Sequence, residues 1–171
     1  WVKFCEKIDE MGKRLEDESM PLAYHPHMGT VIQTERDTSR LMENTNDSVK
    51  LTIDTGHFLF AEGNYMKIAK DFSERLIHVH CKDMRNNVLK KSLKKDLSFR
   101  NAFLEGVFTV PGNGCIDYRP FFNLLKTINY SGWLVVEAEQ DPKKANPFEY
   151  AKKGFEYLSK TLKECKISTT N

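Results

Sequence analysis

The chain has 171 residues and is close to charge balance, with 26 Lys and Arg residues against 24 Asp and Glu and a formal charge of +2. This balance gives no reason to expect nucleic acid or an anionic membrane surface as a partner. The sequence contains neither a signal-peptide pattern nor an apolar run of the roughly 18 residues that a membrane-spanning helix needs. The four cysteines lie far apart without a CxxC pair, which indicates reduced thiols and a cytoplasmic protein.

Helical and strand patterns alternate from the first residues of the chain. Apolar residues at helical spacing predict a helix over residues 1–16, and residues 22–24 follow as a short strand. Thr34 with Asp37 three residues later matches a capping box, which predicts a helix to about residue 43. The next predicted elements are a strand over 49–54, a helix over 65–72 and a strand over 76–80.

The second half of the chain begins with a long insertion from about residue 83 to 111. Its basic run over 90–95 indicates a solvated helix face, and a helix is predicted near 96–105. The segment from Gly106 to Gly114 ends in a strong turn signal and is predicted to be an ordered turn rather than a moving lid. The remaining predicted elements are a helix capped by Asp117, a strand over 134–137, a helix from Asn146 to about residue 163 and a frayed tail over 166–171.

Strands that alternate with helices predict an α/β fold with a parallel sheet. We expect one domain over residues 1–165. A complete (β/α)8 barrel needs about 250 residues, and this chain opens at Trp1 directly in a helical pattern. We therefore expect it to be about the last four βα units of a longer (β/α)8 barrel.

Every predicted strand ends in a polar group of residues. The five histidines of the chain all lie at these strand ends, where random placement would scatter them. Catalytic groups of parallel α/β folds collect at the carboxyl ends of strands. The clusters are His25 with His27, Asp54 with His57, His78 to Asp83, and Glu137 to Asp141.

The alternation of side chains along a strand divides these residues between two faces. His78, His80 and Lys82 share one face of the third strand. Val79 and Cys81 share the other face, so Cys81 is predicted to lie in the core. The same alternation in the other strands places four residues on the polar, axis-facing side: His25, Asp54, Glu137 and Glu139. Trp133, just before the last strand, is predicted to be a core residue.

The charges of imidazoles and carboxylates that are buried inside a barrel must be neutralised. Burying several charges costs several kcal/mol each unless the groups are paired or bind a metal. A mixed nitrogen and oxygen set suits Mn, Co, Fe or Zn better than Ca. Hydrogen bonds alone are the structural alternative, and four clusters on neighbouring strands favour the metal.

The clusters resemble those of the xylose-isomerase-like barrel superfamily and, within it, of the inosose dehydratase family. The resemblance spans about residues 1–160. The similar stretches are Tyr24-His25-Pro26-His27-Met28-Gly29-Thr30, Asp54 to His57, His78 to Arg85, Gly106 to Gly114, and Gly132 to Pro142. The resemblance implies one divalent ion held by His25, Asp54, His80 and Glu137. His25 stands where the superfamily usually has a glutamate, so it is either a ligand or an acid.

The resemblance also implies the reaction. Members of this family remove water from 2-keto-myo-inositol, a cyclic polyol ketone, to give a trihydroxycyclohexane dione. Manganese or cobalt is the expected metal, and glutathione is a further candidate cofactor. Glu137 is expected to act as the base, and His25 is expected to act as the acid.

Other strand-end residues are expected to bind substrate: His27, His57, His78, Lys82, Arg85, Glu139, Gln140 and Asp141. Each has a structural alternative. His27 and His78 would then only orient their neighbours. Lys82, Asp83 and Arg85 would form a salt-bridge network at the rim, with Glu139 paired to one of them.

Three competing functions remain. A sugar isomerase or epimerase of the same superfamily would move a proton without loss of water, but His25 replaces its usual carboxylate. An AP endonuclease needs more metal ligands and a basic DNA face, which the near-neutral charge disfavours. An inactive fragment would expose two sheet edges and would associate through them, so a homo-oligomer is a candidate state.

Overall fold

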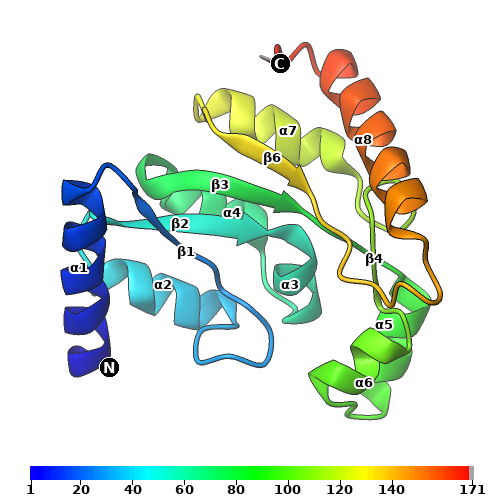
Figure 1. The fold of residues 1–171 in the computed structure, drawn as a ribbon, viewed down its shortest axis with the longest axis horizontal. Helices are drawn as coiled ribbons and strands as arrows, with labels where there is room; N and C mark the ends of the chain where they lie inside the picture. Colours follow the sequence, from blue (N-terminus) through cyan, green and yellow to red (C-terminus); the bar gives the residue numbers. More distant parts are fainter. Residues whose placement is uncertain (170–171) are drawn as a thin grey trace. The chain divides into compact units, whose positions relative to one another are not determined.

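The computed structural model describes residues 1–169. Figure 1 follows the chain through alternating helices and strands. The elements up to β3 are α1 (Val2–Asp17), β1 (Leu22–Tyr24), α2 (Glu35–Glu43), β2 (Val49–Asp54), α3 (Thr55–Phe60), α4 (Tyr65–Asp71), the 3-10 turn η1 (Ser73–Arg75) and β3 (Leu76–Cys81). The elements after β3 are β4 (Asp83–Met84), α5 (Asn86–Lys94), α6 (Phe99–Leu104), β5 (Phe108–Thr109), α7 (Tyr118–Thr127), β6 (Trp133–Val136) and α8 (Pro147–Glu164).

The main sheet has four strands in the order β1-β2-β3-β6. β1 pairs with β2 in parallel, with Leu22 opposite Val49 and Tyr24 opposite Leu51. Five of the six residues of β2 are buried, as expected for a parallel strand that is covered on both faces. The predicted α/β architecture is therefore confirmed. A smaller antiparallel pair, β4 with β5, joins Asp83 to Thr109 and Met84 to Phe108.

The chain divides into two compact units, and each is described by itself. The first unit comprises residues 1–79 and 130–133. Cys5 of α1 packs with Ile32 and Leu41 in its core, and Phe4 and Tyr24 pack against this core. The capping box predicted at the start of α2 is present, because the Asp37 backbone N–H donates to Thr34 and the Asp37 carboxylate accepts from the Thr34 backbone N–H.

Arg75 joins the start of β3 to earlier elements of the first unit. Its Nε donates to Val49 O at 2.7 Å, and its Nη1 donates to Met42 O at 2.6 Å. Nη2 donates to the hydroxyl of Thr45 at 2.7 Å. The guanidinium therefore satisfies carbonyl groups in the last turn of α2 and at the start of β2, which fixes where β3 begins.

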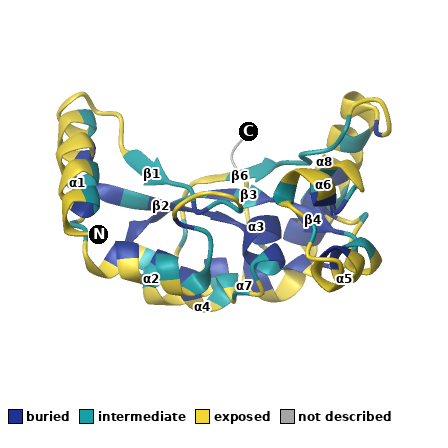
Figure 2. Ribbon diagram, turned by 90° about the horizontal axis from the view of Figure 1, so that it is seen from below, coloured by how far each residue is buried: buried dark blue, intermediate teal, exposed yellow. Residues whose placement is uncertain are grey.

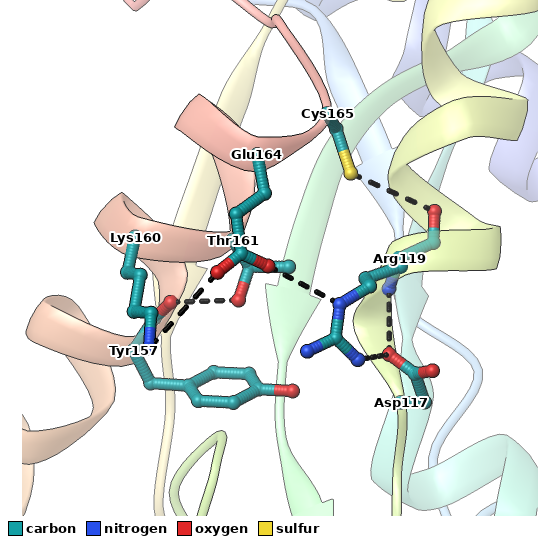
Figure 3. A network of polar contacts seen from close by, with 7 residues as sticks. All are labelled: Asp117, Arg119, Tyr157, Lys160, Thr161, Glu164 and Cys165. Carbon is teal, nitrogen blue, oxygen red and sulfur yellow. Dashed lines mark hydrogen bonds and ion pairs between the residues drawn. The ribbon is translucent and has the colours of Figure 1, made fainter.

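Among the described residues, the second unit comprises 80–129 and 134–169. Here α7 contacts α8, and the side chain of Asp117 caps α7 as predicted. Arg119, in the first turn of α7, links this helix to α8. Its Nη1 is 3.0 Å from Asp117 Oδ1, and its Nε donates to Glu164 Oε2 at 3.2 Å (Figure 3). Gly154 and Leu158 of α8 are buried, whereas most other residues of this helix are exposed. Figure 2 colours the chain by burial and shows β2 of the main sheet as largely buried.

Several local elements differ from the sequence predictions. The helix α3 and the pair β4–β5 were not predicted, because they are six and two residues long and are too short to show a periodic pattern. The basic run belongs to α5, which precedes the predicted helix α6. The prediction that Trp133 lies in the core is wrong, since it is 75% exposed.

The predicted tail over 166–171 is described only in part. Ile167 N donates to Leu162 O at 3.0 Å, and Thr170 and Asn171 lie outside the described residues. Within residues 1–169, every helix is too short or too polar to cross a membrane.

Candidate metal and substrate site

Asp54 links the end of β2 to the start of α3 in the first unit. Its Oδ1 atom accepts a hydrogen bond from the backbone N–H of His57 at 2.9 Å, so Asp54 is the N-cap of the helix. Because the helix begins directly at the strand end, the cap holds the Asp54 carboxylate beside the backbone of His57. The side chain of Asp54 is fully buried.

His25, just after β1, approaches the other oxygen of the same carboxylate. His25 Nε2 lies 3.6 Å from Asp54 Oδ2. His25, Asp54 and His57 each offer one ligand atom, and these three atoms lie within 4.8 Å of one another. Two imidazole nitrogens and one carboxylate oxygen form a donor set that suits a divalent transition metal. The chemistry of this set therefore fits the metal that the sequence predicts.

His57 was expected to bind substrate, and the structure brings it into the group that offers metal ligands. The signal that could have shown this is the spacing of Asp54 and His57. An Asp at an N-cap accepts a hydrogen bond from a backbone N–H two or three residues later, which places the two residues close together at the start of the helix. This local helix start was not recognised in the sequence.

His27 lies beside this group and is oriented by its own contacts. Its Nδ1 atom lies 2.8 Å from Met28 O, and because a carbonyl only accepts, Nδ1 carries the proton. Its ring packs on the His57 ring with a centroid distance of 3.7 Å. This geometry agrees with the structural alternative for His27, which is to orient its neighbours.

The predicted alternation along β3 is confirmed. Val79 and Cys81 are fully buried, whereas His78 and His80 are only partly buried. Cys81 is thus a core residue, as expected. The two histidines lie on the opposite face of the strand, with His80 belonging to the second unit.

Lys82 carries a buried charge in the second unit. Its Nζ atom lies 2.6 Å from Glu137 Oε2 and 2.6 Å from Glu139 Oε2. The predicted pairing of Glu139 with a nearby cation is therefore confirmed. Nζ also lies 4.9 Å from the centre of the Phe108 ring.

Asp83 holds the segment that follows β5. Its carboxylate accepts backbone hydrogen bonds from Met84, Gly112, Gly114 and Ile116 at 2.7–3.2 Å. Burial raises the pKa of Asp83 above its usual range, although the backbone hydrogen bonds oppose this shift. A Cβ atom at Gly114 would lie 2.2 Å from Asp83 Oδ1, so only glycine fits there. The segment is held as an ordered turn, as predicted.

Arg85 likewise binds the segment around β5. Its Nη1 atom donates to Gly106 O at 2.7 Å and to Phe108 O at 2.9 Å, and Nη2 donates to Thr109 at 3.1 Å. Lys82, Asp83 and Arg85 thus contact three different sets of residues. The predicted rim network among these three residues is replaced by these contacts.

Arg85 also lines a cavity of about 210 Å³ in the second unit. Gln140 and Asp141 line the same cavity, together with Lys144 and Tyr150. Three residues that the sequence predicts to bind substrate are thus brought together. The Oε1 atom of Gln140 is buried and has no hydrogen-bond partner within the described part of the chain.

Parallel strands with polar residues at their carboxyl ends are typical of α/β enzymes, in barrels and in open sheets alike. The family model described as "Xylose isomerase-like TIM barrel" matches residues 1–161. The chain belongs to this family.

Curated relatives are similar to nearly the whole chain. An "Inosose dehydratase" of Halalkalibacterium halodurans is 45% identical over 163 residues, which cover 95% of the chain and 54% of the relative. Another, of Salmonella typhimurium, is 47% identical over 95% of the chain and 54% of its own length. The "Rhizopine catabolism protein MocC" of Rhizobium meliloti is 42% identical over 94% of the chain and 49% of its own length. The chain thus spans about half the length of these relatives.

Solved structures show the same fold at low sequence identity. The probable 3-DHS dehydratase AsbF of Bacillus anthracis matches with a TM-score of 0.72 at 12% identity, over 92% of this chain and 56% of that one. The IOLI protein with a binding zinc atom matches with a TM-score of 0.67 at 20% identity, over 92% and 54% of the two chains. These similarities establish the barrel fold.

Proposed function

We propose that the chain is the C-terminal portion, residues 1–165, of a single barrel domain that dehydrates 2-keto-myo-inositol. The observation that carries this proposal is the 45–47% identity to inosose dehydratases along 95% of the chain. Identity of this extent covers all the polar strand ends, and these are the elements on which barrel enzymes carry their chemistry. The substrate is accordingly a small cyclic polyol ketone.

The metal in this proposal is held by Asp54, His80 and Glu137, with His25 either as the fourth ligand or as the acid. These residues lie at or just beyond the carboxyl ends of β1, β2, β3 and β6, which are consecutive in the sheet order. The distance of 3.6 Å between His25 and Asp54 supports the first part of this set. Manganese or cobalt suits the nitrogen and oxygen donors, and glutathione is proposed as a further cofactor from the resemblance alone.

A divalent ion at this position would act as a Lewis acid toward the ketone oxygen of the substrate. Glu137 would remove the proton from the carbon next to the ketone, and the electron pair of that C–H bond would form the new C=C bond. The hydroxyl group on the following carbon would leave with a proton given by His25. One water molecule is released, and the later tautomerisation of the enol product yields the dione.

The remaining strand-end residues are proposed to bind the substrate hydroxyls: His27, His57, His78, Arg85, Glu139, Gln140 and Asp141. Arg85, Gln140 and Asp141 support this role because they line one cavity. A cavity of about 210 Å³ is small, which agrees with a compact polyol. Lys82 was expected in this group, and its burial suggests a different role.

The experiment is incubation of the protein with 2-keto-myo-inositol and Mn²⁺ or Co²⁺, after removal of bound metal with a chelator. The expected result is the absorbance of a conjugated dione, which the chelated protein does not produce. Conversion of the ketone to an isomeric ketone would instead establish an isomerase. Parallel reactions with and without glutathione test that cofactor.

A matched pair of variants tests the base. Glu137→Gln is expected to lower kcat by at least about 100-fold, since general bases contribute about 10²–10⁴-fold to rates. Glu156→Gln makes the same substitution at an exposed glutamate of α8 and should leave kcat unchanged. Undiminished turnover of Glu137→Gln would remove Glu137 from the catalytic group.

A further inference from the structure

The side chain of Lys82 is buried behind two carboxylates. It is only 1% exposed, whereas the side chains of Glu137 and Glu139 are 31% and 23% exposed. A molecule that approaches this group from the solvent therefore meets the carboxylates before it meets the ammonium. Lys82 is poorly placed to hold a substrate hydroxyl directly.

Both carboxylates are fixed by the same nitrogen atom. Each has an oxygen 2.6 Å from Lys82 Nζ, so both form ion pairs with it, and the contact to Glu139 is in addition a charge-assisted hydrogen bond. A buried ammonium is stable only when it is paired with opposite charge, so the two carboxylates in turn hold the Lys82 ammonium in place. The Phe108 ring at 4.9 Å adds a cation–π contact and limits movement of the nitrogen.

The backbone at Glu139 gives independent support. Its φ angle is +41°, a left-handed conformation that is strained for a residue with a Cβ atom. Such strained residues persist when the surrounding contacts determine them, and they concentrate at functional sites. The hydrogen bond from Lys82 Nζ to Glu139 Oε2, at 2.6 Å, is a contact of this kind.

We propose that Lys82 is a positioning residue, which fixes the Glu137 carboxylate for cation binding by clamping Glu137 and Glu139 to one buried ammonium. This inference rests on the proposed function, because Glu137 is there a metal ligand and the base. Lys82 itself touches neither metal nor substrate. Partners that orient a ligand change metal affinity by about 10–100-fold when they are removed.

The sign of the change in metal affinity separates positioning from a plain charge effect. Removal of a positive charge beside a cation site should strengthen cation binding if electrostatics alone matter. Loss of an oriented carboxylate should weaken it. Lys82→Met has a similar length and no charge, and we expect its Mn²⁺ dissociation constant to rise about 10–100-fold, as measured from the free Mn²⁺ signal in electron paramagnetic resonance.

A matched control removes a lysine from an exposed ion pair. Lys91 pairs with Glu105 in the second unit, and both side chains are 45% exposed. Lys91→Met should bind Mn²⁺ as the unchanged protein does. Lys82→Arg keeps the charge but cannot place one nitrogen between the two carboxylates in the same way, and it should restore only part of the affinity.

The inference is overturned if Lys82→Met binds Mn²⁺ as tightly as the unchanged protein, or more tightly. If this variant does not fold, Lys82→Arg is measured instead, and an unchanged dissociation constant overturns the inference. If the unchanged protein binds no Mn²⁺, the proposed metal function fails by itself. Crystal structures then decide on Lys82, since unchanged Glu137 and Glu139 carboxylates in the variant would exclude a positioning role.

Discussion

His25 Nε2 lies 3.6 Å from Asp54 Oδ2, so an imidazole beyond β1 and a carboxylate at the end of β2 meet above two paired parallel strands. The other oxygen of Asp54 is already engaged by the backbone N–H of His57. One carboxylate therefore has two tasks, because one oxygen caps a helix and the other faces His25. Variants that separate these tasks test the metal proposal without disturbing the fold.

Asp54→Asn is expected to keep the cap and lose the metal. The amide oxygen of Asn caps a helix as well as Asp does, so α3 should be retained. The loss of the anionic ligand should lower metal affinity at least as much as the loss of an orienting partner, by about 100-fold. Elemental analysis after dialysis measures the metal, and circular dichroism measures the helix.

The control for Asp54→Asn is Asp71→Asn, which changes an exposed carboxylate paired with Lys67 in the same unit. This variant should keep the full metal content. A full metal content in Asp54→Asn would contradict the ligand assignment. Asp54→Ala should lose both the metal and about 1 kcal/mol of stability, because it removes the cap.

The capping box of α2 should make stability depend on pH. Burial raises the pKa of Asp37, but the hydrogen bonds from the Thr34 hydroxyl and backbone lower it more, so the pKa lies below its usual value. Because the folded-state pKa is lowered, the contribution of Asp37 to the free energy of unfolding is complete above the unfolded pKa of about 3.9. This contribution is lost as the pH falls through the folded-state pKa.

Asp37→Asn is therefore expected to lower the free energy of unfolding by about 1 kcal/mol at pH 7 and by less below pH ~4. Urea unfolding at a series of pH values measures the difference from the unchanged protein. Thr34→Ser keeps the capping hydroxyl and should follow the unchanged protein at every pH. A difference for Asp37→Asn that grows as the pH falls would contradict the capping role.

Gly114→Ala should destabilise the second unit through a direct clash. The added Cβ would lie 2.2 Å from Asp83 Oδ1 and 2.5 Å from Met84 O, and neither atom can move without loss of the Asp83 hydrogen bonds. Overpacking of this kind costs about 3 kcal/mol. Gly63→Ala is the control, because its Cβ would meet its nearest neighbours at 3.3 Å. Equal unfolding midpoints in urea for the two variants would contradict this account.

The elements that the sequence predicted well are those defined by local chemistry. Thr34 with Asp37 and Asp117 cap their helices as expected, because an N-cap needs only a side chain and an N–H two or three residues away. The alternation along β3 is equally local, and it identified Cys81 as a core residue.

The features that were missed depend on contacts between distant residues or on very short elements. Asp83 binds backbone N–H groups 29–33 residues later in the chain, and no local pattern predicts such a turn. Alternation gives the direction of a side chain but not whether another element covers it, which explains the error at Trp133. The approach of His57 to His25 depends on α3, and this six-residue helix is recognisable only by its cap.

Gln140 offers a prediction in which function and stability respond in different directions. Its Oε1 atom is buried without a hydrogen-bond partner among residues 1–169 and belongs to a residue that lines the 210 Å³ cavity. An unsatisfied buried oxygen costs about 1–3 kcal/mol, so Gln140→Leu should leave the free energy of unfolding unchanged or raise it. A substrate hydroxyl would satisfy this oxygen, so the same variant should raise KM for 2-keto-myo-inositol about 10-fold and change kcat little.

The control for Gln140→Leu is Gln33→Leu, which removes a side chain that accepts from Gly29 N in an exposed loop of the other unit. This variant should leave KM unchanged. A lower stability of Gln140→Leu together with an unchanged KM would show that Gln140 serves the fold and not the substrate.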